Sequence, residues 1–81
     1  MNISFKDAIV KRVNLSKDEQ TAYLRLLDMQ EAEIFEIGVP AAGAPKENTR
    51  GAIQLSGVGI FPKRDGGFFA RADGITVPKS Q

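Results

Sequence analysis

The sequence predicts an all-β fold: a small five-stranded antiparallel barrel from which a C-terminal hairpin protrudes. Along residues 51–78, apolar residues alternate with small or polar ones, which is the period of a strand with one buried face. The turn at residues 63–67 interrupts this pattern with Asp-Gly-Gly, and glycines accept the positive φ of a tight hairpin. The flanking regions also alternate, and a barrel would leave few exposed strand edges.

The composition limits the chemistry that the chain can perform. Its 81 residues form one domain, residues 1–81, at a size where a single core is barely sufficient, so we expect a homodimer. The chain has no cysteine and no histidine, which removes disulfides, thiolate metal sites and the commonest general base. We therefore expect neither an enzyme nor a bound cofactor or metal. Paired carboxylates such as Glu33 and Glu36 are the remaining catalytic alternative, but nothing in the sequence tunes their acidity.

The charges are distributed unevenly along the chain. Between Asp18 and Glu36 there are six acidic residues and one basic residue, Arg25, a balance of −5. Because the net charge is +1, the rest of the chain carries +6. Such an asymmetry can steer a polyanion to one surface, although a solvated acidic face with scattered lysines is the alternative. No apolar run approaches the roughly 20 residues that span a bilayer, so we expect a cytoplasmic protein without a membrane partner.

The N-terminal segment, residues 2–15, is predicted to be one bent or bulged strand. Ile3 and Phe5 share one alternation phase, whereas Ala8 and Val10 share the other. One inserted residue in the pairing would produce this change of phase.

The middle of the chain admits two interpretations. Ser16–Glu19 fits a capping box, and the apolar residues after it fit a helix over residues 17–34 packed on a sheet. The same residues also fit a strand over 21–29 and a partner strand over 32–39. We favour the two strands because both flanking regions alternate as strands. Three residues would then face the core: Ala22, Leu24 and Leu26.

The glycine-containing segments match no phosphate-binding motif. Residues 40–51 are a loop by composition and lack the Gly-Lys-Ser/Thr ending of a phosphate loop. Gly57 and Gly59 lack the third glycine of a dinucleotide-binding turn. We expect these two glycines to mark a bulge or a bend in a strand.

Aromatic residues beside basic ones form the candidate site. On a strand, Tyr23 and Arg25 point outward together, as a base-stacking platform requires. The adjacent Phe68 and Phe69 must point to opposite faces, so one joins the core and the other is exposed, where it could stack on bases or lie in a dimer interface. Lys11 and Arg12 could contact phosphates or serve as strand-edge charges.

Three segments resemble a known family. Phe61–Gly67 looks like the protruding hairpin of the single-stranded DNA-binding proteins of filamentous bacteriophages, and Ile75–Lys79 is similar to their closing strand. Tyr23–Asp28 is similar to their segment of alternating apolar residues that ends in an acid. The resemblance implies a dimeric OB-like barrel that coats single-stranded DNA cooperatively and without sequence preference during replication, in the host cytoplasm.

The predicted function is therefore sequence-independent binding of single-stranded nucleic acid through basic residues and aromatic stacking. The alternative is a small protein-interaction module with an acidic helix that binds no nucleic acid. The candidate binding residues are Lys11, Arg12, Tyr23, Arg25, Lys63, Arg64, Phe68 and Arg71.

Overall fold

The computed structural model describes residues 1–77, and these form a single sheet with one short 3₁₀ helix. The all-β prediction is confirmed. The alternative helix over residues 17–34 is wrong, because this segment holds two strands and no helical turn. The strands are β1 (Ile3–Leu15), β2 (Thr21–Asp28), β3 (Glu33–Pro40), β4 (Arg50–Ser56), β5 (Gly59–Pro62), β6 (Phe68–Arg71) and β7 (Gly74–Thr76), and the 3₁₀ helix η1 is Ala41–Gly43.

The sheet curls around one core, and a two-residue segment connects β6, near one end of the sheet, to β7 at the other end. The strand order is β5-β6-β3-β2-β1-β4-β7. β6 pairs with β3 and β7 pairs with β4, although only two residues separate β6 from β7. The Ala72 N–H donates to the Gly38 carbonyl at 2.8 Å. The β3–β6 pair is parallel, so the prediction of a wholly antiparallel sheet is wrong at this point.

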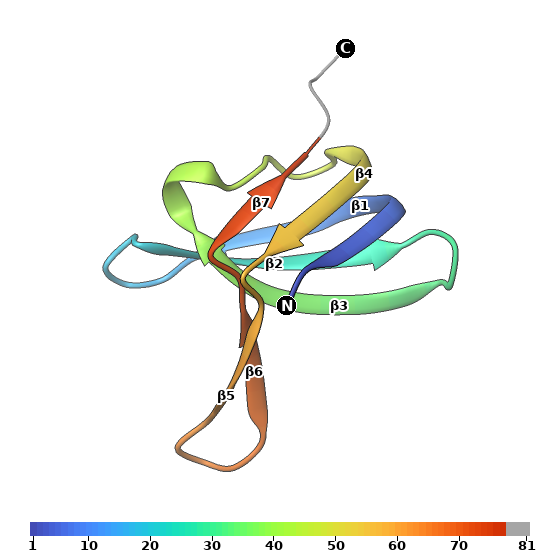
Figure 1. Cartoon of the computed structure of the whole chain (residues 1–81). Helices are drawn as coiled ribbons and strands as arrows, with labels where there is room; N and C mark the ends of the chain where they lie inside the picture. The colour runs from blue at the N-terminus through green and yellow to red at the C-terminus, as the bar shows by residue number, and fades with distance from the viewer. Residues whose placement is uncertain (78–81) are drawn as a thin grey trace.

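The predicted C-terminal hairpin is present but sharply bent, which is why the sheet has more strands than the five predicted. Gly57 has a φ of +63° and lies between β4 and β5. Opposite this bend, the Asp73 N–H donates to the Ser56 carbonyl at 2.8 Å. Beyond the bend, β5 and β6 leave the curled sheet and project from it (Figure 1). The turn closes with the Lys63 N–H donating to the Gly67 carbonyl at 3.1 Å.

The core is aliphatic and lies inside the curled sheet. All three residues predicted to face inward on β2 are buried. Burying each such leucine stabilises the fold by about 1.5–3 kcal/mol. Phe5 and Phe35 pack against each other at the edge of the core, with ring centroids 5.7 Å apart. The buried hydrophobic residues are Ala8, Val10, Ala22, Leu24, Leu26, Ile37, Val39, Ile53, Leu55, Val58 and Ala72.

Two bulges bend β1. The first, between Phe5 and Ala8 in the pairing with β4, is the predicted change of phase. The second was not predicted: Val10 pairs with Leu26 and Arg12 pairs with Arg25, so Lys11 is an extra residue in the ladder with β2. Because of this extra residue, Arg12 lies on the outer face although the alternation from Val10 would point it inward.

The Ser16–Glu19 segment is a turn rather than a helix start. The Ser16 hydroxyl donates to Asp18 Oδ1 at 2.6 Å, and the Gln20 N–H donates to the same oxygen at 3.0 Å. The bond from the Ser16 hydroxyl is the larger cause that holds the pKa of Asp18 below its ordinary value, and the bond from the Gln20 N–H adds to it. Short polar side chains satisfy nearby backbone groups in turns as well as at helix starts, so the same residues fit both structures.

Residues 44–49 cover the bulged part of β1. The Asn48 N–H donates to the Val10 carbonyl at 2.7 Å, and the Val10 N–H donates to the Thr49 carbonyl at 2.8 Å. Glu47 Oε2 accepts the Val13 N–H at 3.1 Å. The predicted loop is therefore confirmed, and it satisfies backbone groups of β1 beyond Ile9, the last residue of β1 that pairs with β4.

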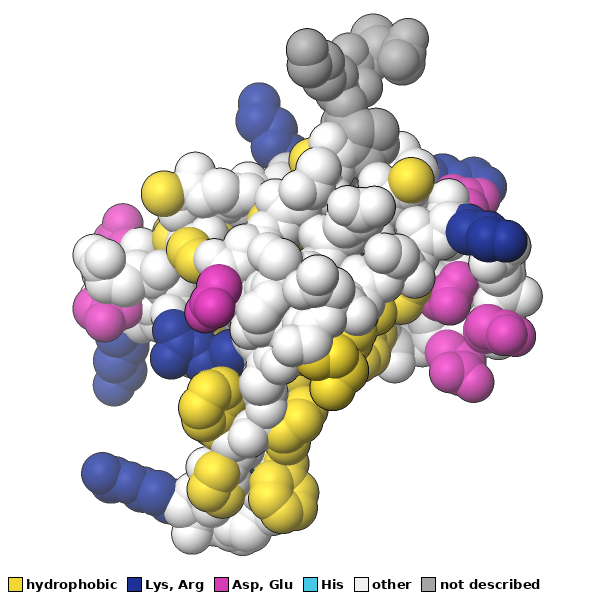
Figure 2. Space-filling view, viewed as in Figure 1, with side chains coloured by type: hydrophobic (Ala, Val, Ile, Leu, Met, Phe, Trp, Pro, Cys, Tyr) yellow, Lys and Arg dark blue, Asp and Glu magenta, His cyan; other side chains and the backbone are white. Residues whose placement is uncertain are grey.

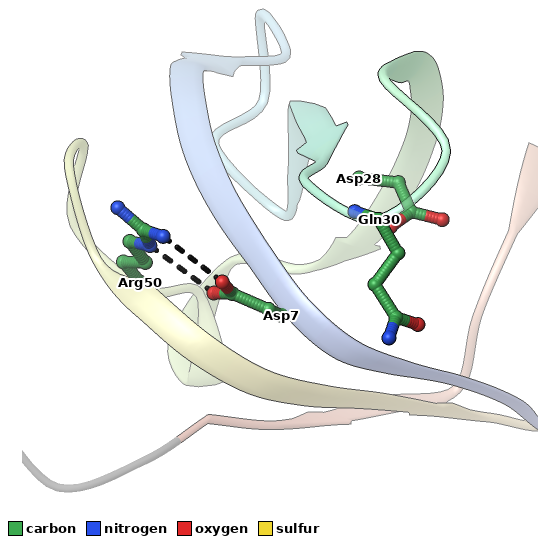
Figure 3. Close-up of polar contacts among 4 residues, drawn as sticks. All are labelled: Asp7, Asp28, Gln30 and Arg50. Carbon is green, nitrogen blue, oxygen red and sulfur yellow. Dashed lines mark hydrogen bonds and ion pairs between the residues drawn. The ribbon is translucent and has the colours of Figure 1, made fainter.

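Two polar contacts lie on either side of β1 (Figure 3). On one side, the Arg50 guanidinium donates to both carboxylate oxygens of Asp7, at 2.9 and 3.1 Å. On the other side, Asp28 Oδ1 accepts the Gln30 N–H in the turn between β2 and β3. No helix within residues 1–77 is long and apolar enough to cross a membrane.

Candidate nucleic-acid interface

A groove of about 630 Å³ lies between the outer face of the sheet and the hairpin. Strands β1, β2 and β3 form one wall, and β5, β6 and the start of the hairpin turn form the other. Figure 2 shows hydrophobic side chains gathered along the hairpin, with basic side chains beside it. Among the lining residues are Arg12, Tyr23, Arg25, Ile60, Lys63 and Phe68.

A row of charged residues crosses the sheet wall of the groove. Arg12 on β1 pairs with Arg25 on β2, and Arg25 pairs with Glu36 on β3. The Arg25 guanidinium donates to Glu36 Oε2 through Nη2 at 2.9 Å and Nε at 3.1 Å. The ion pairs within residues 1–77 are this one and Arg50–Asp7, and Arg12 belongs to neither. The row therefore offers an anion Arg12, which is in no ion pair within residues 1–77, beside Arg25, which is already paired with Glu36.

Tyr23 lies in the next row, directly opposite Gly38. A β carbon built on Gly38 would lie 3.4 Å from Tyr23 Cε1, so the ring lies against the backbone of β3. Tyr23 is nevertheless 48% exposed. The ring is therefore in contact with the sheet on one side, and about half of the residue is available to a ligand. A ring held in this way can stack on a base without first losing rotamer entropy.

The hairpin supplies the apolar wall of the groove. Ile60 pairs with Ala70 and Pro62 pairs with Phe68, so these four side chains share one face of the hairpin. Ile60 is 59% exposed and Phe68 is 71% exposed. Lys63 follows at the start of the turn and also lines the groove. The exposed phenylalanine and isoleucine could contact the face of an unpaired base, and the lysine beside them could contact its phosphate.

The opposite face of the hairpin carries a stacked aromatic pair. Phe61 and Phe69 are directly opposite, with ring centroids 5.6 Å apart and planes inclined at 30°. The prediction that Phe68 and Phe69 point to opposite faces is confirmed. The prediction that one of them joins the core is wrong, because the hairpin projects beyond the curled sheet and Phe69 stacks on Phe61 instead.

The structure brings five of the eight predicted binding residues into the groove and leaves three outside it. Lys11 is the extra residue of the second β1 bulge, and Arg64 lies in the hairpin turn. Arg71 lies on β6 at the same alternation phase as Phe69, away from Phe68. The sequence did not single out Ile60, whose exposure depends on the projection of the hairpin from the curled sheet. The five groove residues are Arg12, Tyr23, Arg25, Lys63 and Phe68.

The structure does not bring together the candidate carboxylate pair, Glu33 and Glu36. Glu33 and Glu36 are three positions apart on β3, so their side chains point to opposite faces of the strand. Within residues 1–77, no three acidic side chains lie close enough together to hold a metal ion. The end of the predicted closing strand, Pro78 and Lys79, lies outside the described residues.

Comparisons with protein-family models, with curated proteins and with solved structures find no match to this chain.

Proposed function

We propose that this protein binds single-stranded DNA without sequence preference, along the groove between the sheet and the hairpin. One observation carries the proposal: one wall of the groove presents the exposed Tyr23 ring beside the row of Arg12 and Arg25, and the other wall presents the exposed Phe68 ring. Aromatic rings stack on every base, and guanidinium and ammonium groups neutralise phosphates. Such contacts carry affinity but little sequence information.

The chemistry of the groove favours unpaired over paired strands. In a duplex, the faces of the bases are covered by neighbouring bases, so a stacking ring has no surface to contact. Tyr23 and Phe68 can therefore add affinity only for splayed bases, whereas Arg12 and Lys63 would attract either form. A protein with this function would act in the cytoplasm, where unpaired strands arise during replication.

The single tyrosine provides a direct test. Because the chain has one tyrosine and no tryptophan, its ultraviolet fluorescence reports on Tyr23 alone. A titration with an oligothymidylate of about 10 nucleotides should quench this fluorescence as a base covers the ring. The apparent affinity should fall with salt, with a log–log slope of about −0.7 for each phosphate contact.

The Tyr23→Phe variant is the matched control. It keeps an aromatic ring, so it should bind a dye-labelled oligonucleotide with nearly unchanged affinity, measured by anisotropy, while the tyrosine signal disappears. If wild-type protein at about 100 µM and low salt gave neither quenching nor an anisotropy change, the proposal would be abandoned.

A further inference from the structure

An apolar row crosses the outer face of the sheet beyond the groove. Ile9 on β1 pairs with Leu27 on β2, and Leu27 pairs with Ile34 on β3. Both neighbours of Ile9 in the chain, Ala8 and Val10, are buried, so Ile9 and the two residues paired across from it point outward. Ile34 is 56% exposed. We call Ile9, Leu27 and Ile34 the apolar row, and none of the three lines the groove.

Two arginines separate the apolar row from Tyr23. The outward residues of β2 are Tyr23, Arg25 and Leu27 in that order, each roughly 7 Å from the next. Arg12 lies beside Arg25 on β1. A ligand that crosses the sheet along β2 therefore meets an aromatic ring, then two guanidinium groups, then aliphatic side chains. A single nucleic-acid strand presents bases and phosphates in the same alternation.

The charges beside the apolar row favour an anion. Each of the two acidic residues there is engaged by an arginine, since Arg25 donates to Glu36 and Arg50 donates to Asp7. Arg12, by contrast, belongs to no ion pair within residues 1–77. Three guanidinium groups thus face two carboxylates. A phosphate between the apolar row and Tyr23 would meet net positive charge.

Two further glutamates near Ile34 in the sequence lie off the row. Glu33 precedes Ile34 on β3 and therefore points to the opposite face of the strand. Glu31 lies in the connection between β2 and β3, past the end of the row. Its carboxylate would repel a phosphate, so a polyanion that follows β2 should end its contact with the sheet at this connection.

We propose that the apolar row is a second contact site for single-stranded DNA, where a base packs on Leu27 and Ile34 while an adjoining phosphate lies on the two arginines. This inference rests on the proposed function, and it extends the bound strand out of the groove. Aliphatic side chains contact bases in this way where proteins unstack them. Tyr23 and Leu27 are about 13 Å apart at ~3.3 Å per residue, whereas stacked bases are about 3.4 Å apart. The strand is therefore extended over the sheet, with its bases splayed.

Methyl NMR of the wild-type protein tests this contact directly. A base that packs on a methyl group shifts its resonance through the ring current. Titration with an oligothymidylate of about 10 nucleotides should therefore shift the methyl resonances of Leu27 and Ile34 together with the ring resonances of Tyr23. The methyl groups of Leu15, which is 55% exposed and lies outside both the groove and the apolar row, should not shift. Shifts at Tyr23 without shifts at Ile34 would overturn this inference and leave the proposed function standing. An absence of shifts at both residues would overturn both.

A matched pair of variants measures what the apolar row contributes. Ile34→Ser should weaken binding of the same oligonucleotide by about 3- to 5-fold, as expected for the loss of one small apolar contact. The salt slope should stay unchanged because no charge is removed. The quenching of Tyr23 at saturation should also stay unchanged, because the groove still holds the strand. Leu15→Ser alters an equally exposed aliphatic residue elsewhere and should bind as the wild type does.

The contrary results for the variants are distinct. Equal affinity of Ile34→Ser and Leu15→Ser would overturn the inference. So would a change in the sedimentation coefficient of Ile34→Ser without oligonucleotide, because the row would then be an interface between copies of the chain. Circular dichroism checks that both variants keep their strands. Should one of them unfold, the NMR titration still decides, since it uses the wild-type protein.

Discussion

The ring of Tyr23 lies against Gly38 of the adjacent strand, on the wall of the groove. A β carbon on Gly38 would approach Tyr23 Cε1 to 3.4 Å and Thr21 Cγ2 to 3.2 Å. The glycine therefore provides the space that the ring occupies beside β3. In this position the ring contacts β3 and is still 48% exposed. The close packing at Gly38 therefore supports the proposed stacking of Tyr23 on a base.

Replacing Gly38 with alanine should displace this ring and weaken oligonucleotide binding. The added methyl group requires its neighbours to move by a few tenths of an ångström, so we expect a smaller loss than in Tyr23→Ala. Removing the ring should weaken binding by about 1–3 kcal/mol, roughly 5- to 150-fold. Anisotropy with a labelled oligothymidylate measures both. Equal binding by wild type and Tyr23→Ala would show that the ring contacts no base.

Neutralising Glu36 should strengthen binding. In the wild type, the Glu36 carboxylate accepts two bonds from Arg25 and competes with a phosphate for this guanidinium. Glu36→Gln removes the competing charge, so the affinity should rise and the salt slope should steepen by about 0.7 if one more phosphate contact forms.

Arg12→Ala should make the salt slope less steep by a similar amount. Lys46→Ala, on the loop outside the groove, serves as the control and should leave the slope unchanged. An unchanged slope in Glu36→Gln would place the phosphates elsewhere.

The strands could be predicted where the sequence alternates without interruption. The β2 alternation, the Asp-Gly-Gly turn and the change of phase near Asp7 each depend on residues close together in the chain. The second β1 bulge could not be predicted, because an extra residue such as Lys11 has no characteristic side chain. The helix suggested by Ser16–Glu19 illustrates the converse. Its local hydrogen bonds are compatible with either structure, and pairing with distant strands decides between them.

The candidate site was predicted only in part because it is assembled by long-range pairing. Tyr23 and Arg25 are two positions apart, so a strand alone places them together. The pairing of Arg25 with Glu36 depends on the β2–β3 register, and the approach of Phe68 depends on the bend at Gly57. Neither is visible in a local pattern. Arg71 differs, because the alternation along β6 already gives it the phase of Phe69 and points it away from Phe68.

The bend that directs the hairpin away from the sheet should depend on a glycine at position 57. It has a φ of +63°, and a β carbon there would collide with the Asp73 carboxylate. Gly57→Ala should therefore destabilise the protein by at least about 1 kcal/mol and lower its melting temperature by several degrees. Gly43→Ala is the matched control, because a β carbon at Gly43 meets nothing within 4 Å. If the two variants had the same melting temperature, the backbone at Gly57 would have to accommodate a β carbon, and the prediction would be wrong.

The ion pair between Asp7 and Arg50 should make part of the stability depend on pH. The hydrogen bonds from Arg50 are the largest cause that lowers the pKa of Asp7 below its ordinary value of 3.8. A carboxylate whose pKa is lower in the folded state stabilises the fold above its unfolded pKa, and this contribution is lost as the pH falls through the folded pKa. Asp7→Asn should therefore melt below the wild type at about pH 6 and converge with it at about pH 2. The difference should be small because both side chains are exposed.

Arg50→Gln should behave in the same way, and the melting temperature of the double variant should fall no further than that of either single variant. Thermal unfolding followed by circular dichroism across this pH range measures the effect, and a difference that persists at pH 2 would assign the role of Asp7 to the backbone of the bulge rather than to its charge.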